Sequence, residues 1–258
     1  MYRSKLFLLG MFVFILAACQ EAPSGSSPSG KSQYIVYMDE EQGIDPYQTR
    51  IIVTPQFVRF DDGEGSEDYV VFDRNSRTIY SVNTQSRTVM LVHEKKSDLQ
   101  APFELVYSVK DLGEMKDAPQ IKQHAPRHYQ YLTNETVCLD VVSLPELMPE
   151  AVVAMQEFHE VLASDSAATF SNLPADMHAP CDISLSTFAP TQHLQNGFPI
   201  REWKPGYSRM LVDFQEDYQA DPALFELPAD YFTYSVQDLR EGKVDFANRR
   251  MVGEEPRQ

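Results

Sequence analysis

Histidine and cysteine are the residue types in this sequence best suited to ligate a metal or act as a nucleophile. The chain holds 6 histidines and 3 cysteines. His124 and His128 stand four positions apart, but Pro126 between them disfavours the continuous helix that would put both imidazoles on one face. No aspartate or glutamate adjoins that pair at metal-ligand spacing. His159 falls inside a predicted helix, and His178 stands three residues before a cysteine. We therefore expect no specific metal site and no cofactor.

The sequence lacks the local motifs of the common enzyme classes. It contains no G-x-S-x-G, no H-E-x-x-H and no glycine loop followed by Lys-Ser or Lys-Thr. Acidic residues are abundant, and two of them could form a glycosidase-like pair, but sequence gives no distance between carboxylates. We expect a solvated acidic face and no enzymatic activity. A hydrolase with an unrecognised acidic site is the weakest of three hypotheses.

The N-terminus has the pattern of an export signal. Arg3 and Lys5 precede an apolar run of 13 residues, 6–18, which only Gly10 interrupts. A helix that spans a bilayer needs roughly 20 residues, so a permanent transmembrane anchor is the weaker interpretation. Residues 1–18 are therefore predicted to be a signal peptide that is removed on export.

The residues that follow resemble the lipobox of bacterial lipoproteins. Leu16-Ala17-Ala18 leads directly to Cys19. The resemblance implies cleavage before Cys19, a diacylglyceryl group on its sulfur and an acyl group such as palmitate on its amine. Three chains anchor a protein stably. Position 20 holds Gln in place of the Asp that resembles an inner-membrane retention signal. This difference favours the outer membrane, with the domain facing the periplasm. The alternative is an ordinary signal peptide with an incidental cysteine.

Composition limits the other partners. Acids outnumber bases 38 to 22, a net charge of −16, and loss of Arg3 and Lys5 with the signal peptide gives −18. Such a charge repels phosphate backbones and anionic membrane surfaces, so we expect no nucleic-acid partner and membrane contact only through the anchor. Residues 19–33 are rich in Ser, Pro and Gly and predict a flexible, lipid-anchored tether.

The two remaining cysteines, Cys138 and Cys181, form an even set in an exported chain. The simplest interpretation is a structural disulfide. It would close a loop between positions 43 apart and hold the intervening helical region over the sheet. A redox centre is disfavoured because there is no C-x-x-C. Free thiols are the open alternative.

The folded part is predicted to be one domain at 34–241, followed by a polar tail at 242–258. Short β-type runs separated by polar turn formers suggest antiparallel hairpins. The runs are 34–38, 49–54, 56–60, 69–72, 78–82, 88–92, 103–107, 136–142, 198–203 and 207–214. Pro149 opens a helix, and Ala151, Met155, Phe158 and Leu162 form its apolar stripe.

Several of these segments resemble the LolA/LolB-like lipoprotein-carrier superfamily. The matches are Phe57-Val-Arg-Phe-Asp61 with the two strands that follow it, Gly197-Phe-Pro-Ile-Arg201, and Leu224-Phe-Glu-Leu-Pro-Ala-Asp-Tyr231. The resemblance implies an α+β fold in which a curved antiparallel sheet, an open half-barrel, is closed by one or two helices. In the named carriers the apolar concavity accepts acyl chains. This chain departs from them in its longer middle region and its cysteine pair, and a fold does not by itself specify a function.

Two functional hypotheses remain ahead of the hydrolase. The first is a non-enzymatic exported lipoprotein that binds an apolar ligand, such as an acyl chain or the anchor of another lipoprotein, in the half-barrel. The second is an envelope scaffold or interaction protein whose core is filled by its own side chains. Strand alternation gives the candidate lining residues of the first hypothesis as Val58, Phe60, Tyr80, Val82, Met90, Val92, Met210 and Val212.

Overall fold

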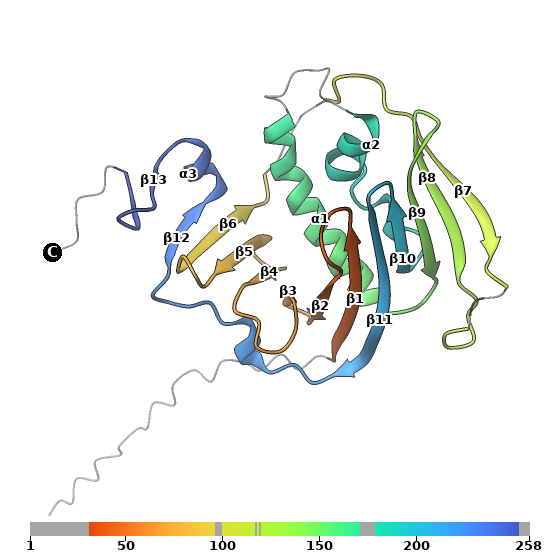
Figure 1. The fold of residues 1–258 in the computed structure, drawn as a ribbon, viewed down its shortest axis with the longest axis horizontal. Coiled ribbons are helices and arrows are strands. Elements are labelled where there is room, and N and C mark those ends of the chain that lie inside the picture. The colour runs from red at the N-terminus through yellow and green to blue at the C-terminus, as the bar shows by residue number, and fades with distance from the viewer. Residues whose placement is uncertain (1–30, 96–99, 117, 119, 171–178, 253–258) are drawn as a thin grey trace, which may run out of the picture.

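The domain is built on one large β-sheet. The computed structural model describes residues 31–95, 100–116, 118, 120–170 and 179–252. Twelve strands lie in the order β12-β6-β5-β4-β3-β2-β1-β11-β10-β9-β8-β7, with β12 at one end and β7 at the other (Figure 1). Their bounds are β1 Ser32–Glu41, β2 Tyr47–Val53, β3 Phe57–Asp61, β4 Tyr69–Asp73, β5 Thr78–Asn83, β6 Thr88–His93, β7 Tyr107–Glu114, β8 Arg127–Thr133, β9 Thr136–Leu144, β10 Phe198–Lys204, β11 Tyr207–Tyr218 and β12 Phe232–Ser235.

Two antiparallel meanders, β1–β6 and β7–β11, make up the sheet, and the β1–β11 pair joins them. Tight turns connect several of the consecutive strands, such as β4 to β5, β5 to β6 and β8 to β9. Asn134 and Glu135, between β8 and β9, have φ of 49° and 64°, as a two-residue hairpin turn with positive φ at both positions requires. Short hairpins of this kind account for the antiparallel order that the turn residues predict.

The predicted α+β half-barrel closed by helices is wrong. The sheet is mixed, because β12 pairs parallel to β6, and it ends at β12 and β7 without closing. The described residues are mainly β. The sequence pattern missed β8, where His128 and Gln130 alternate with the buried Tyr129 and Tyr131, and it placed the 103–107 strand too early. β8 and β7 extend the second meander, so the sheet is larger than the curved sheet that we expected.

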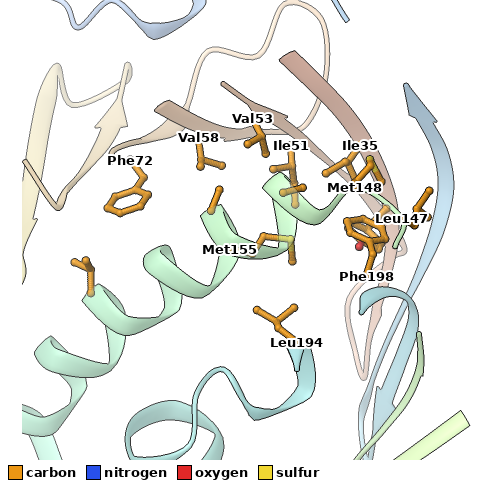
Figure 2. Packing of buried hydrophobic residues seen from close by; sticks show 14 of the residues in the cluster. Ile35, Ile51, Val53, Val58, Phe72, Leu147, Met148, Met155, Leu194 and Phe198 are labelled. Carbon is orange, nitrogen blue, oxygen red and sulfur yellow. The ribbon is translucent and has the colours of Figure 1, made fainter. Parts of the chain in front are cut away.

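One long helix, α1 (Pro149–Phe170), packs on what we call the helix face of the sheet. Its Ala151, Ala154 and Met155 are almost fully buried. Figure 2 shows Phe72, Val58 and Ile51 extending from the strands toward α1. The sheet contributes Ile35, Tyr37, Ile51, Val53, Val58, Phe72, Ile79, Val92, Leu144 and Phe198 to this core. The helix and the sheet therefore fill the space between them with their own side chains.

The opposite, outer face of the sheet is partly covered by the chain that leaves β11. A short 3₁₀ turn, η4 (Pro222–Phe225), places Phe225 against Ile52 and Val71. Below it, Asp61 accepts hydrogen bonds from Arg50 at 2.7 and 2.8 Å and from Arg59 at 2.5 Å. The chain then adds β12 to the edge of β6 and continues into α3 (Val236–Arg240), β13 (Val244–Asp245) and β14 (Arg250–Met251).

A disulfide joins Cys138 on β9 to Cys181 on α2 (Pro180–Ile183), with a Cα–Cα distance of 5.1 Å. The predicted pairing is confirmed. It fixes α2 and the π-helical turn that follows it, η2 (Ser184–Phe188), over the second meander, and η3 (Gln192–Leu194) leads from there back to β10.

None of the helices in the described ranges combines the length and the apolar character needed to cross a bilayer. The predicted signal peptide, Cys19 and most of the predicted tether lie outside those ranges. β1 begins at Ser32, close to the predicted start of the domain.

Candidate functional site

The structure does not bring the eight predicted lining residues together. Val58 and Val92 belong to the core under α1, and the ring of Phe60 stacks on Phe158 of the helix at 4.5 Å between centroids. Met90 shares their face, because it pairs with Ser81 while the neighbouring Val92 pairs with Ile79. Val58, Phe60 and Val92 are therefore packed in the core that α1 covers, so α1 occupies the position where an open concavity was expected.

The other four lie on the outer face. Tyr80 pairs with Val71, which contacts η4 on that face, and Val82 is two residues further along the same strand. Met210 and Val212 are 51% and 49% exposed. In β11 it is Leu211 that packs toward the core. Alternation identified which residues share a face within each strand, but not which face is covered.

A pocket of about 410 Å³ opens on the helix face, between α1, the η2–η3 segment and strands β9–β11. We call it the Glu202 pocket. It is lined by Glu41, Leu139, Met155, His159, Leu185, Pro190, His193, Glu202, Lys204, Tyr207 and Arg209. Such a size is in the range of small-molecule sites, which combine apolar walls with a few placed polar groups.

Strand register sets the polar groups side by side. Glu202 on β10 pairs with Arg209 on β11, and Arg209 pairs in turn with Asp39 on β1. Directly opposite residues of an antiparallel pair project from the same face, so a row of charge crosses three strands toward α1. His159 comes from the middle of α1 and His193 from η3. Five segments thus meet at one site: β1, α1 and the consecutive η3, β10 and β11.

The most buried polar groups of the pocket are His193 and Glu202, which are 8% and 7% exposed. Nε2 of His193 stands 3.6 Å from Oε1 of Glu202, which is too long for a hydrogen bond. Nδ1 of His193 has no hydrogen-bond partner among the described residues. Buried polar atoms are normally satisfied, so this atom without a partner marks the His193 ring as an unusual part of the pocket wall.

Arg209 and Asp39 form a satisfied ion pair next to them. Nε of Arg209 donates to Oδ1 of Asp39 at 2.7 Å, and its Nη2 lies 3.3 Å from Oδ2. The Tyr207 hydroxyl and the Thr49 hydroxyl also donate to Asp39, at 3.0 and 2.7 Å. Burial opposes ionisation of Arg209, but the bond to Asp39 outweighs it and raises the pKa of the guanidinium. Asp39 therefore neutralises Arg209.

The two histidines of the pocket are uncharged at neutral pH. Burial lowers the pKa of His159 to about 3, and the neighbouring His193 adds to the effect. Burial likewise lowers the pKa of His193 to about 4, with a contribution from Arg209. Their rings meet edge to face at 5.5 Å between centroids. Burial raises the pKa of the Glu202 carboxyl. Clustered shifts of this kind are typical of functional sites, although structural networks also produce them.

A second pocket, of about 500 Å³, lies at the start of α1 and is lined in part by Val53, Pro55 and Val153. Its wall includes Lys31, the first described residue, so part of its boundary is not described. The basic groups there are already paired, Lys31 with Asp217 and Arg74 with Glu157.

Within the described residues no three His, Cys, Asp or Glu side chains are grouped so that they could hold a metal ion. His124 and His128 have different partners. Nε2 of His124 stands 3.6 Å from Oε2 of Glu146, and Nε2 of His128 lies 2.7 Å from Oδ1 of Asp140 on the sheet. His178 lies outside the described residues.

Glu202, His193 and Arg209 were not among the residues that sequence reasoning selected. A weak signal was present: Glu202 shares a short strand with Phe198, Ile200 and Trp203, and Arg209 alternates with Met210 and Val212 of β11. Without the register of β1, β10 and β11 nothing indicates that the two charges face the same space.

Comparisons with known proteins give limited information. No family model and no curated protein matches the chain. An uncharacterised conserved protein from Thermus thermophilus superposes with a TM-score of 0.41 and 8% identity, over 81% of this chain and 92% of that one. Two crystal forms of PNGF-II superpose with TM-scores of 0.37, at 7% and 10% identity, over 82% and 85% of this chain but only 33% and 32% of theirs. These similarities are too low to carry an argument about fold or function, and the resemblance to the lipoprotein carriers stays a prediction.

Proposed function

We propose that this protein is an exported, lipid-anchored binding protein that holds a small ligand in the Glu202 pocket and has no enzymatic activity. The single observation that carries the proposal is an open pocket of about 410 Å³ in which the buried Glu202 carboxylate and Nε2 of His193 stand 3.6 Å apart, too far for a hydrogen bond between them. Leaving such groups unsatisfied costs free energy that a ligand can recover.

The filled core changes the expected ligand. An acyl chain was expected along the concave sheet, but α1 occupies that position with Ala151, Ala154 and Met155. The Glu202 pocket offers apolar walls with a polar interior. We therefore assign the ligand to this pocket and infer a polar small molecule in place of an acyl chain.

The rest of the proposal comes from the sequence. Lipidation of Cys19 would attach the chain to the outer membrane, and 19–33 would let the domain stand clear in the periplasm. The charge of −18 after removal of the signal peptide argues against a nucleic-acid partner.

Native mass spectrometry of the mature protein, purified gently from its own membrane, tests this function. We expect a triacylated N-terminus at Cys19 and a small molecule that is released on denaturation. Leu185→Trp, which fills the pocket wall, should abolish the bound molecule. Leu239→Trp on α3, where the side chain is 42% exposed, should retain it. Equal retention by both variants would refute the pocket assignment.

A second candidate function, a scaffold for an envelope complex, is favoured by the free edge of β7. Val106, Val109, Leu112 and Met115 are 56%, 41%, 53% and 38% exposed along this end strand. An edge strand with exposed apolar side chains can accept an extended segment of a partner as a further strand. A partner crosslinked to the native protein, lost in Val109→Lys but kept in Val252→Lys, would support this function.

A further inference from the structure

The carboxylate of Glu202 lacks the partners that a buried charge requires. Its side chain is buried on β10, and the described residues place no hydrogen-bond donor on its oxygens. A buried carboxylate without a donor or a cation is costly, because desolvation of the charge is not repaid. The pocket therefore contains a carboxylate to which no described residue supplies a cation or a hydrogen-bond donor.

The neighbouring basic side chains do not pair with the Glu202 carboxylate. Arg209 is already held by two bonds to Asp39. Lys204 is exposed at the mouth, with its Nζ 5.9 Å from the centre of the Tyr207 ring. His193 stands beyond hydrogen-bond distance from the carboxylate.

An anionic ligand fits this arrangement poorly. It would have to approach Glu202, with Glu41 at the same pocket, while the guanidinium of Arg209 stays committed to Asp39. Like charges at close range in a poorly solvated site disfavour binding.

We propose that the Glu202 pocket binds a small organic cation, a compact amine or guanidine, whose N–H groups donate to the Glu202 carboxylate and to Nε2 of His193, which stands 3.6 Å from that carboxylate. This rests on the proposed function and names the ligand class for the same site. Neutral imidazole nitrogen is an acceptor as well as a donor, so His193 can take one N–H and Glu202 the others.

The remaining walls suit the carbon part of such a ligand. Leu139, Met155 and Leu185 provide apolar contact, and the rings of His159 and Tyr207 border the same space. Aromatic faces also attract cations. The ligand would place its charged end beside Glu202 and its carbon chain along these side chains.

Titration calorimetry of the full mature protein with pentylamine, pentanol and pentanoate tests the ligand class, because the three probes share one carbon chain and differ in charge. We expect pentylamine to bind at least about tenfold more tightly than either of the others, a difference of about 1.4 kcal/mol. Glu202→Gln, which keeps the shape and removes the charge, should weaken pentylamine by a similar factor. Glu226→Gln, an exposed glutamate that follows η4 and does not line the pocket, should leave the affinity unchanged.

The outcomes separate this inference from the proposed function. Binding of pentanol or pentanoate that equals or exceeds that of pentylamine, and that Leu185→Trp abolishes, would overturn the cation assignment and leave a ligand pocket. Pentylamine binding that Glu202→Gln leaves intact would overturn it as well. Absence of pentylamine binding overturns the cation assignment, and the proposed function then depends on the molecule released from the native protein.

Discussion

His193 presents Nε2 to Glu202 at 3.6 Å, while its other ring nitrogen is buried and has no partner among the described residues. The two side chains come from η3 and β10, which lie on either side of one turn. Both are removed from water, and neither receives a hydrogen bond that compensates for the loss. This pair, more than the apolar face of the sheet, distinguishes the site from the rest of the core.

The affinity for pentylamine should rise with pH. Burial raises the pKa of Glu202, so this carboxyl takes up a proton more readily as the pH falls than an exposed glutamate does, and a cation competes with that proton. Binding therefore releases protons at acidic pH and strengthens until Glu202 is ionised in the free protein. The other titratable or charged groups that face it are Asp39, Glu41, His159, His193, Lys204, Tyr207 and Arg209.

His159 and His193 lose their protons at more acidic pH than the measurement covers, with pKa values of about 3 and about 4. Calorimetry between about pH 5 and 8 should show the rise in the native protein and a flat profile in Glu202→Gln. A rise of the same size in the variant would assign the dependence to another group.

His193→Gln should make stability less sensitive to acid. The pKa of His193 is about 4 in the folded protein against an ordinary 6.5, so the unfolded chain binds a proton first as pH falls below 6.5. One histidine then removes up to about 1.4 kcal/mol of stability per pH unit. Urea unfolding between about pH 7 and 4 should show a shallower loss in the variant than in the native protein.

The raised pKa of Glu202 acts in the opposite direction and stays in both proteins, so the difference between the two curves reports the loss of His193 together with the relief of its effect on the pKa of His159, which has the same sign. His93→Gln, at an exposed position on β6, serves as the control and should keep the native slope. An unchanged slope in His193→Gln would show that this ring does not titrate as its burial requires.

Removal of the disulfide should weaken both stability and ligand binding. A loop closed between residues 43 apart is worth about 4 kcal/mol in the chain-entropy account. Cys138→Ser with Cys181→Ser also frees α2 and η2, which carry Leu185 into the pocket wall. Urea unfolding and calorimetry of the double variant check the two effects. Loss of stability with unchanged affinity would show that this wall does not depend on the crosslink.

Asp61→Asn should destabilise the fold strongly. Burial opposes ionisation of Asp61, but hydrogen bonds from Arg50 and Arg59 prevail and lower its pKa. The variant leaves two buried guanidinium groups without their anion, which costs about 3–5 kcal/mol. Asp111→Asn, in an exposed pair with Arg127, should change the midpoint of urea unfolding far less. Similar shifts in the two variants would contradict this account of the outer face.

The sequence was most informative where local chemistry decides the structure. Pro149 opens α1, short apolar runs between polar turns became strands of the first meander, and the cysteine pair formed its bridge. β8 was missed because its RHYQYLT pattern is polar on one face, and the parallel strand β12 depends on an edge that only the finished sheet provides.

The site could not be derived in the same way. Tyr80 and Met90 are both apolar positions on adjacent strands, yet the hairpin register puts them on opposite faces. Which residues of β11 face the helix depends likewise on pairing: the register with β1 turns Arg209 inward and Met210 outward. The sequence alone does not show how strands more than 160 residues apart, such as β1 and β11, are paired.

Nuclear magnetic resonance of the full mature protein with labelled histidine rings tests the central claim most directly. On titration with pentylamine we expect the ring signals of His159 and His193 to shift together and to saturate, while those of His93 and His128 stay in place. Leu185→Trp should abolish the shifts. Saturable binding that moves none of the pocket histidines, or that moves His128 in their place, would contradict the assignment of the Glu202 pocket as the ligand site.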